Sequence, residues 1–416
     1  MKEFPEKEER ITEKERRNLD ILDTIRRKRE VSRAEISKIT GLNIVTISNY
    51  VNSYVRNDLV HETGLDVSTG GRRPELLKLN KEFGYSIGVD LGAPHIVEDT
   101  YMIACLLDMS SKIVAKEKIE KVQEPQDKFI ERIIKLISAL IKKGGVDKSK
   151  IKGIGFGIWG PLDRYKGTAR YAVENGGTIS YTSIQKTVEE KFGMPSIVEH
   201  DSMVAALGEK WAGIGLEEGV ENILFVCSDS SVGMIIKGEL YYGATKSAGE
   251  LNINPPGESP LHCWEGYNYG CCLRSRGIDL GIPAYARLYL ESNKEVKSKI
   301  SELTNNSPDK ITLDIVAKAA KDGDKTAIKF LAEAGNYLGA KIAYLINLFN
   351  PEAVVIGRGI EKLGNVLFDA VESAARHWGY EEATRVVKII PASLGEDTVA
   401  VGAGALVIQK IFAKIN

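Results

Sequence analysis

The chain has 416 residues, of which 43% are hydrophobic and 27% charged, so its length exceeds one compact core and predicts two or three domains. The formal net charge of −1 excludes a globally basic nucleic-acid-binding protein, and any DNA contact must come from a local surface. No apolar run approaches the roughly 20 residues that span a bilayer. The charged start is unlike a secretory signal, and five scattered cysteines suggest no disulfide framework, so we expect a reduced, cytoplasmic protein.

Two helices open the chain. Residues 12–29 carry an apolar stripe at helical spacing and end in basic residues, as a helix dipole favours. Ser32 and Glu35 form a capping box, which predicts a second helix over 33–40. Gly41 follows, and glycine readily takes the left-handed conformation of a tight turn.

A third helix is predicted to begin after Asn43. Its apolar positions recur at helical spacing and predict a core face: Ile44, Ile47, Val51, Tyr54 and Val55. Helix, glycine turn and helix form a helix-turn-helix, whose second helix fits the major groove. Asn can read adenine edges, while Ser and Thr bond to bases or phosphates. The predicted DNA contacts are Asn43, Val45, Thr46, Ser48, Asn49 and Asn52.

Residues 61–80 predict a β-hairpin wing, because apolar residues flank a centre rich in Ser, Gly and Pro. Arg72 and Arg73 lie near its tip, where arginines can grip phosphates or enter the minor groove. The alternative for residues 1–82 is a small helical domain with a solvated charged face. The hairpin favours DNA binding.

From residue 83 the pattern changes to buried strands. Strands are predicted over 85–91, 101–107, 112–119 and 151–158, with a helix over 126–143 before the last of them. Three strands, a helix and a strand open one half of the actin-like ATPase and sugar-kinase fold. Residues 223–226, 233–237 and 239–241 repeat this opening. Duplicated halves of this kind enclose a ligand-binding cleft.

Eight segments carry a resemblance to the ROK family of repressors, open reading frames and kinases. They are SRAEISKITGLNIVTISNYV, GGRRPELLKLN, GVDLGA, IGFGIWGPLD, PSIVEHDSMVAALGEKWAG, YYGATKSAGELNIN, GNYLGAKIAYLINLFNPEAVVIG and VGAGALVIQ. The resemblance implies an α/β fold, a winged helix-turn-helix followed by a duplicated actin-like ATPase or sugar-kinase (RNase H-like) two-lobed body. The implied parts are the DNA-binding domain 1–82, a first lobe 83–199 with 385–416 packing back on it, and a second, effector-binding and dimerising lobe 200–384.

Asp201 resembles the family's catalytic base and Glu250 its sugar-binding glutamate. A carboxylate accepts a hydrogen bond from a sugar hydroxyl even without catalysis; the alternative for Asp201 is a solubilising charge at a strand end. His200 replaces the family's usual Asn, and Trp159 a proline. The indole can stack on a sugar face or pack in the core. The expected effector contacts are Asp201, Glu250, His200, Trp159, Gly160 and Asn175.

The family's zinc motif is degenerate in this chain. Four soft ligands remain, namely His262, Cys263, Cys271 and Cys272, but the middle cysteine of the motif is missing and the last two are adjacent. The alternative is a metal-free loop that is held by packing of Trp264, Tyr267 and Tyr269. We expect no cofactor, with zinc as the alternative.

The phosphate-binding loops of the family's kinases are also altered. Pro94 removes an N–H donor from the first loop, and Asp229 and Ser231 replace small neutral residues in the second. The sequence therefore predicts a DNA-binding transcriptional regulator, a homodimer or homotetramer, that senses a hexose, pentose, amino sugar or cyclitol. The alternatives are a bifunctional sugar kinase that also binds DNA and a plain metabolic kinase.

Overall fold

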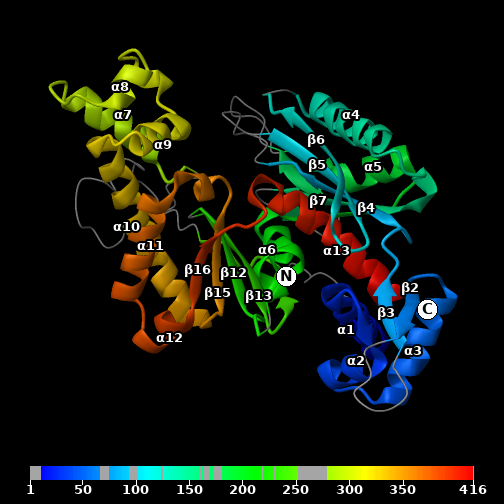
Figure 1. The fold of residues 1–416 in the computed structure, drawn as a ribbon. Helices are drawn as coiled ribbons and strands as arrows, with labels where there is room; N and C mark the ends of the chain where they lie inside the picture. The colour runs from blue at the N-terminus through cyan, green and yellow to red at the C-terminus, as the bar shows by residue number, and fades with distance from the viewer. Residues whose placement is uncertain are drawn as a thin grey trace, which may run out of the picture. The chain divides into compact units, whose positions relative to one another are not determined.

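A computed structural model describes residues 11–65, 75–92, 101–122, 125–158, 162–163, 168–171, 180–217, 219–228, 230–251 and 279–415 (Figure 1). The chain forms two compact units. It passes from the first to the second between His200 and Asp201, and returns between Val399 and Ala400. Within the described residues, no helix is long and apolar enough to cross a membrane.

The N-terminal domain joins three helices to a small sheet, coloured blue in Figure 1. The helices are α1 (Glu13–Lys28), α2 (Arg33–Thr40) and α3 (Ile44–Arg56). The antiparallel sheet has the order β1 (Val31–Ser32), β3 (Glu75–Leu79), β2 (Val60–Leu65). The three predicted helices are thus confirmed, and the two strands that follow them pair antiparallel, as a wing requires.

The predicted helix boundaries follow from side-chain caps. Ser32 and Glu35 form the expected capping box, and Gly41 ends α2 at a φ of 70°. The N–H of Thr46 donates to Oδ1 of Asn43 (2.8 Å) at the start of α3. Each cap satisfies backbone groups that lack an intrahelical partner, so the turn between α2 and α3 is fixed by local chemistry.

One predicted core position in α3 is wrong. Ile47, Val51 and Tyr54 are buried as expected, but Ile44 is 46% exposed, and Val55 is only half-buried. Ile44 is the first residue of the helix, and helical side chains lean towards the N-terminus. Its side chain therefore projects past the end of α3 and away from the core.

The body of the first unit is a five-stranded sheet of order β11-β7-β4-β5-β6. Its strands are β4 (Tyr85–Asp90), β5 (Tyr101–Asp108), β6 (Ile113–Glu120), β7 (Ile151–Ile158) and β11 (Ser196–His200). Strand β4 runs antiparallel to β5 and parallel to β7. Helices α4 (Gln126–Gly144) and α5 (Ile184–Phe192) supply the buried core on one face. A small sheet adds β8 (Leu162–Asp163), β9 (Thr168–Tyr171) and β10 (Ser180–Ser183).

The second unit repeats this sheet with the order β14-β13-β12-β15-β16. Its strands are β12 (Ile223–Cys227), β13 (Ser231–Ile236), β14 (Glu239–Leu240), β15 (Ala353–Gly357) and β16 (Lys388–Pro391). Strand β12 is again antiparallel to its successor and parallel to β15. The sequence predicts that residues 385–416 pack back on the first lobe. The chain returns to the first unit later than that, because residues 388–391 pair with β15 of the second sheet and only residues 400–416 join the first unit.

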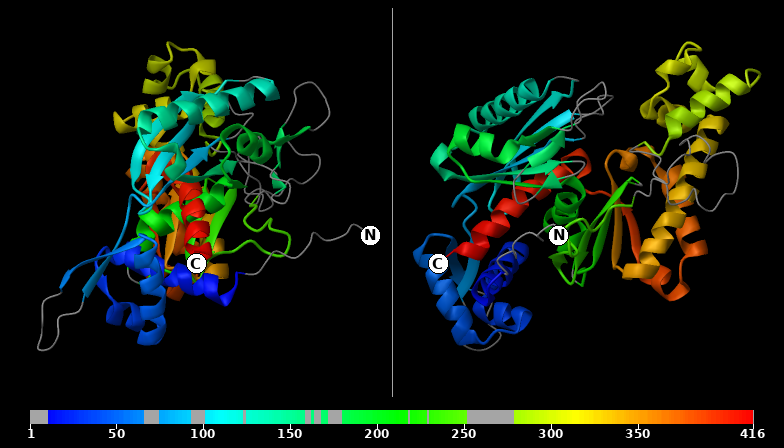
Figure 2. Two further views of the ribbon diagram at one scale, coloured as in Figure 1. Left: turned by 90° about the vertical axis from the view of Figure 1, so that its right-hand side faces the viewer. Right: turned by 180° about the vertical axis from the view of Figure 1, so that it is seen from behind.

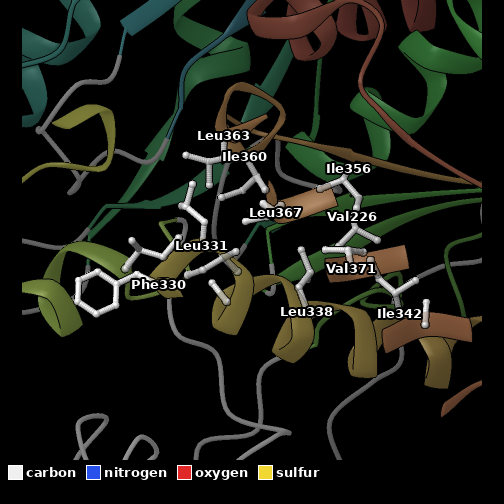
Figure 3. Packing of buried hydrophobic residues seen from close by; sticks show 14 of the residues in the cluster. Val226, Phe330, Leu331, Leu338, Ile342, Ile356, Ile360, Leu363, Leu367 and Val371 are labelled. Atoms are coloured by element: carbon white, nitrogen blue, oxygen red, sulfur yellow. The ribbon is translucent and has the colours of Figure 1, made fainter. Parts of the chain in front are cut away.

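The helices of the second unit are α6 (Asp201–Ala212), α7 (Ile282–Ser292), α8 (Lys299–Leu303), α9 (Leu313–Lys321), α10 (Lys325–Phe349), α11 (Asn365–Trp378) and α12 (Glu381–Val386). Helix α6 packs on one face of the sheet and α10 and α11 on the other, while α7, α8 and α9 lie beyond the sheet near one end of α10 (Figure 1). Figure 3 shows the core between the strands and α10 and α11, where Val226 and Ile356 meet Leu338 and Val371. An added Cβ at Gly339 would lie 2.4 Å from the carbonyl oxygen of Val371, so α10 and α11 pack almost backbone to backbone.

Each sheet also receives one helix at very close range. Helix α13 (Thr398–Lys414) lies across the first sheet (Figure 2), where a Cβ at Gly88 would be 1.8 Å from the carbonyl oxygen of Ala400. In the second sheet, a Cβ at Gly233 would be 1.8 Å from the carbonyl oxygen of Ser202, in the first turn of α6. Only glycine permits these two approaches.

Candidate DNA interface and effector site

The recognition surface of α3 presents short side chains to solvent. Val45 is 66% exposed, and Asn43, Asn49 and Asn52 are exposed. Thr46 and Ser48 are half-buried, and the Ser48 hydroxyl donates to the carbonyl oxygen of Ile44 (2.8 Å). All six predicted DNA contacts, the N-cap Asn43 and five residues of α3, are thus at least partly accessible to solvent. Exposed Ile44, which sequence reasoning assigned to the core, adds an apolar group of the kind that meets thymine methyls.

Arg33 fixes the recognition helix against the base of the hairpin. Its guanidinium pairs with Glu62 of β2 (2.6 Å) and Glu75 of β3 (3.4 Å), and Nη2 also donates to Oδ1 of Asn52 (3.4 Å). One side chain from α2 therefore joins α3 to both wing strands. Sequence reasoning missed this role, because nothing in the spacing of Arg33 distinguishes it from a solvated charge. The wing arginines Arg72 and Arg73 lie outside the described residues.

Asp201 begins α6 directly after β11 and is fully buried. The backbone N–H of Ser202 donates to its Oδ1 (2.7 Å). Arg358 donates to its Oδ2 from Nε (3.1 Å) and from Nη2 (2.7 Å). Both carboxylate oxygens are therefore engaged, and the buried charge is balanced by a guanidinium that is 16% exposed.

Arg358 adopts an unusual backbone conformation. It follows β15 with a φ of 71°, in the left-handed region that costs a non-glycine residue about 1 kcal/mol or more. The surrounding structure holds it there, and its side chain reaches Asp201. Sequence reasoning missed Arg358. The available signal was a lone arginine between two glycines immediately after a buried strand.

Glu250 is placed beside β13 by a short antiparallel contact with Ser231. The N–H of Val232 donates to the carbonyl oxygen of Gly249 (2.7 Å), and the N–H of Leu251 to that of Ser230 (3.1 Å). Gly249 has a φ of 102°, and an added Cβ would lie 2.1 Å from the carbonyl oxygen of Val232. The backbone thus sets Glu250 at β13, and α6, which starts at Asp201, packs on the same strand through Gly233.

Ser231 adds an unexpected polar group to this part of the second unit. Its hydroxyl is buried and makes no hydrogen bond within the described residues. A buried hydroxyl without a protein partner is usually satisfied by water or by a ligand. The neighbouring Ser230 hydroxyl is instead bonded to the carbonyl oxygen of Cys227 (3.1 Å). Ser231 therefore joins Asp201 and Glu250 as a candidate effector contact.

His200 ends β11 and is half-buried, and its backbone N–H donates to Oε1 of Glu199 (2.6 Å). The other predicted positions lie outside the described residues, namely Trp159, Gly160, Asn175, Pro94, Asp229, His262, Cys263, Cys271 and Cys272. In the described part of the chain, no three His, Cys, Asp or Glu side chains are grouped so that they could hold a metal ion.

Comparisons with known proteins extend over nearly the whole chain. The xylose repressor of Caldicellulosiruptor bescii is 27% identical over 396 residues, which cover 94% of this chain and 95% of that protein. The glucokinase of Halalkalibacterium halodurans is 30% identical over 332 residues, which cover 78% of this chain and 95% of that protein.

A solved structure extends the likeness to the fold. The crystal structure of a ROK family transcriptional regulator, a homologue of the E. coli MLC protein, matches with a TM-score of 0.71 and 22% identity, over 96% of this chain and 97% of that chain. This match confirms the expected α/β fold. The family model for the ROK family matches residues 86–410. The chain belongs to the ROK family.

Proposed function

We propose that this protein is a DNA-binding transcriptional regulator, a repressor of carbohydrate-utilisation genes that responds to a sugar. One observation carries the proposal. The xylose repressor aligns over 94% of the chain, whereas the glucokinase aligns over 78%. The regulator's likeness therefore extends over more of the chain, and the described N-terminal residues form the helix-turn-helix and the hairpin.

The second unit supplies the chemistry for sugar recognition. Asp201 and Glu250 are hydrogen-bond acceptors, and Ser231 adds a hydroxyl that can both donate and accept. Arg358 keeps the Asp201 carboxylate in one orientation. A fixed acceptor is what hydroxyl recognition requires, since a site built to bond a hydroxyl rejects analogues that lack it.

The test uses the full chain and double-stranded DNA that the wild type selects from a random library. We expect nanomolar-range binding to the selected duplex, of the order of 10⁻⁸ M or tighter. D-xylose is the first probe, followed by hexoses, amino sugars and cyclitols. A sugar that binds only the folded protein raises its melting temperature, and it should also change the affinity for DNA. A chain that selects no DNA sequence at all would refute the proposal.

A bifunctional sugar kinase is the second candidate, since the glucokinase is 30% identical over most of its length. Two contacts argue against it. The ion pair with Arg358 favours the charged form of the Asp201 carboxylate, which can still accept a hydrogen bond from a sugar hydroxyl but is opposed to taking its proton, and the N–H of Gly92 donates to Oδ1 of Asp90 (2.7 Å) at the first phosphate loop. Ser231 replaces a glycine of the second loop. We therefore propose that the chain binds its sugar without phosphorylating it.

A coupled assay with ATP and the sugar found by the screen decides between the two. Kinases typically turn over at about 1 per second or faster. No measurable ADP release is expected from the wild type. Turnover near that rate would establish the bifunctional kinase instead.

We also propose that the chain works without zinc. The four candidate ligands include two adjacent cysteines, which make poor partners in one tetrahedral site. Elemental analysis of protein purified without chelators should find well under one zinc per chain. One tightly held zinc per chain would contradict this and make Cys263, Cys271 and Cys272 the first ligands to test.

We propose a homodimer, because helix-turn-helix proteins bind two half-sites through two-fold symmetry. One surface of the second unit supports this. Five large apolar side chains there are between 57 and 67% exposed, namely Tyr344, Leu348, Trp378, Tyr380 and Val386. The N–H of Tyr380 donates to Oδ1 of Asn347 (2.7 Å), which ties α10 to the segment before α12. Beside them lies a hollow of about 590 Å³ that both Tyr380 and Val386 line.

The size of this surface suits self-association. Aromatic side chains bury on the order of 150–250 Å² each, so the three aromatic ones, about three-fifths exposed, present roughly 360 Å², to which Leu348 and Val386 add. That is a large share of the ~800 Å² that each partner buries in a standard interface. Light scattering of Trp378→Glu should show monomers where the wild type is dimeric. Val114→Glu, an exposed position on β6, is the control and should leave the dimer intact.

A further inference from the structure

Asn18 joins three distant parts of the first unit through one buried side chain. It lies on α1 and is 1% exposed. Its Nδ2 donates to the carbonyl oxygens of Ala413 (3.0 Å) and Ile415 (2.9 Å), at the end of α13. Its Oδ1 accepts a hydrogen bond from the hydroxyl of Tyr54 (2.7 Å), which belongs to the recognition helix α3.

These bonds restrict how α1, α3 and the end of α13 can move relative to one another. The last carbonyls of a helix have no intrahelical partner. The Asn18 amide satisfies the carbonyl of Ala413, in the last turn of α13, and that of Ile415, the first residue after the helix. Burial raises the pKa of the Tyr54 phenol, so the hydroxyl stays protonated and remains a donor. A buried polar group that loses its partner is costly, so this network favours one arrangement of α1, α3 and α13.

The other end of α13 is tied to the first sheet. A Cβ at Gly155 would lie 2.1 Å from the carbonyl oxygen of Ala403, and one at Gly88 would meet Ala400 at 1.8 Å. Helix and sheet are thus in backbone contact and should move together. The 17 residues of α13 span about 25 Å. The helix begins at Thr398, at the point where the chain leaves the second unit for the first.

We infer that Asn18 is a positioning residue that couples the recognition helix α3 to the first five-stranded sheet. Helix α13, which begins where the chain returns from the second unit, carries a displacement of that sheet to its own C-terminal end, and Asn18 passes it to α3 through Tyr54. The regulatory part of this inference rests on the proposed function. The mechanical part, that Tyr54 and the end of α13 are energetically coupled, does not.

The first experiment tests the mechanical part without DNA or sugar. Tyr54→Phe removes one hydroxyl from the recognition helix, and hydrogen exchange is then measured at the last turn of α13, residues 411–415. We expect exchange there to become roughly tenfold faster, which corresponds to about 1.4 kcal/mol. Tyr50→Phe is the matched control, since it lies on the same helix with its ring 6.2 Å from that of Tyr54.

Asn18→Leu is the second variant and should give a larger increase at the same residues. If both substitutions speed exchange only within α1 and α3, Asn18 serves local packing of the N-terminal domain and the inference is wrong. The same holds if Tyr50→Phe accelerates the end of α13 as much as Tyr54→Phe does.

The second experiment tests the regulatory part with the selected DNA and D-xylose. In the wild type, the ratio of DNA dissociation constants with and without saturating D-xylose measures the coupling. Tyr54→Phe should reduce this ratio at least threefold while D-xylose itself binds unchanged. A purely structural role would weaken DNA binding equally with and without the sugar. If the wild type shows no response to D-xylose, the sugar assignment fails, and the exchange experiment still decides the role of Asn18.

Discussion

The two five-stranded sheets have the same strand order and the same strand directions, but each packs closely against a helix that connects it to a different part of the molecule. The first sheet holds α13 through Gly88 and Gly155, and α13 ends at the DNA-binding domain. The second sheet holds α6 through Gly233, and α6 begins with Asp201. In the functions proposed above, one copy of a duplicated framework would transmit the signal and the other would recognise the sugar, and the helix that each sheet holds makes the difference.

Adding one methyl group to each docking glycine is the strongest test of this contrast. Gly88→Ala and Gly233→Ala would each place a Cβ 1.8 Å from a helix carbonyl, so each should cost roughly 3 kcal/mol of the free energy of unfolding. Gly88→Ala should mainly weaken DNA binding, and Gly233→Ala should mainly weaken sugar binding.

Urea unfolding, DNA titration and sugar-dependent melting of the two variants check this. Gly193→Asn is the control, because its φ of 68° suits asparagine and nothing lies within 4 Å of an added Cβ. If both docking variants lost DNA and sugar binding in the same proportion, the division of labour between the sheets would be refuted.

Asp201→Asn tests the recognition side alone. It leaves the half-buried guanidinium of Arg358 facing a neutral amide, which should cost about 2 kcal/mol of stability, less than full removal of a buried ion partner. Sugar affinity should fall at least tenfold, and the sugar should no longer change DNA affinity. Asp369→Asn, on α11, is the control. Calorimetric sugar binding that is unaffected by Asp201→Asn would remove this residue from the effector site.

Asn49→Ala and Thr46→Ala test the DNA-binding side. Each should weaken binding to the selected duplex by about 1–3 kcal/mol if it makes a good base contact, with little effect on random DNA. Arg72→Ala or Arg73→Ala should weaken both and flatten the salt dependence. Asn57→Ala, beyond the C-terminal end of α3, is the control, and anisotropy titrations at several salt concentrations separate the outcomes.

The smallest effect is expected at Glu209, a buried carboxyl of α6 that accepts the Ser393 hydroxyl (2.8 Å). Burial raises its pKa above the ordinary 4.5. The folded state therefore holds the proton to a higher pH than the unfolded state does, and stability falls as pH rises from about 4.5 through the raised value. Glu209→Gln should flatten this slope and stay within about 1 kcal/mol of wild type near pH 4. Unfolding curves of wild type and Glu209→Gln between pH 4 and 8 give the dependence of stability on pH. If Glu209→Gln leaves that dependence unchanged, the raised pKa of Glu209 is not its cause.

Local signals predicted the N-terminal helices and the opening strands of each sheet well, because their causes are local. The Ser32 capping box and the Gly41 turn predicted where α2 begins and ends, and the repeated strand pattern predicted the two similar sheets. The contacts within the candidate effector site could not be predicted in this way. Arg358 reaches Asp201 across 157 residues, and the burial of the Ser231 hydroxyl without a partner in the described residues depends on the tertiary fold.

The same limit applied to the core of the recognition helix. Periodicity placed Tyr54 in the core correctly, but it could not show that its hydroxyl meets Asn18 there. Periodicity also assigned Ile44 to the core, since a repeat pattern does not show where a helix begins. Spacing therefore predicts which face of an element is buried, while the polar partners of buried groups depend on the tertiary fold.

The bonds of Asn18 also bear on how regulators of this kind can be recombined. Its acceptors, the carbonyls of Ala413 and Ile415, lie 395 and 397 residues further along the chain. A chimera that exchanges residues 1–82 alone would bring a new α1 to an old α13. Because the acceptors are backbone atoms, any sequence at the end of α13 can serve, provided that the helix ends in the same place. Portability of the DNA-binding domain thus depends on matched backbone geometry at Asn18.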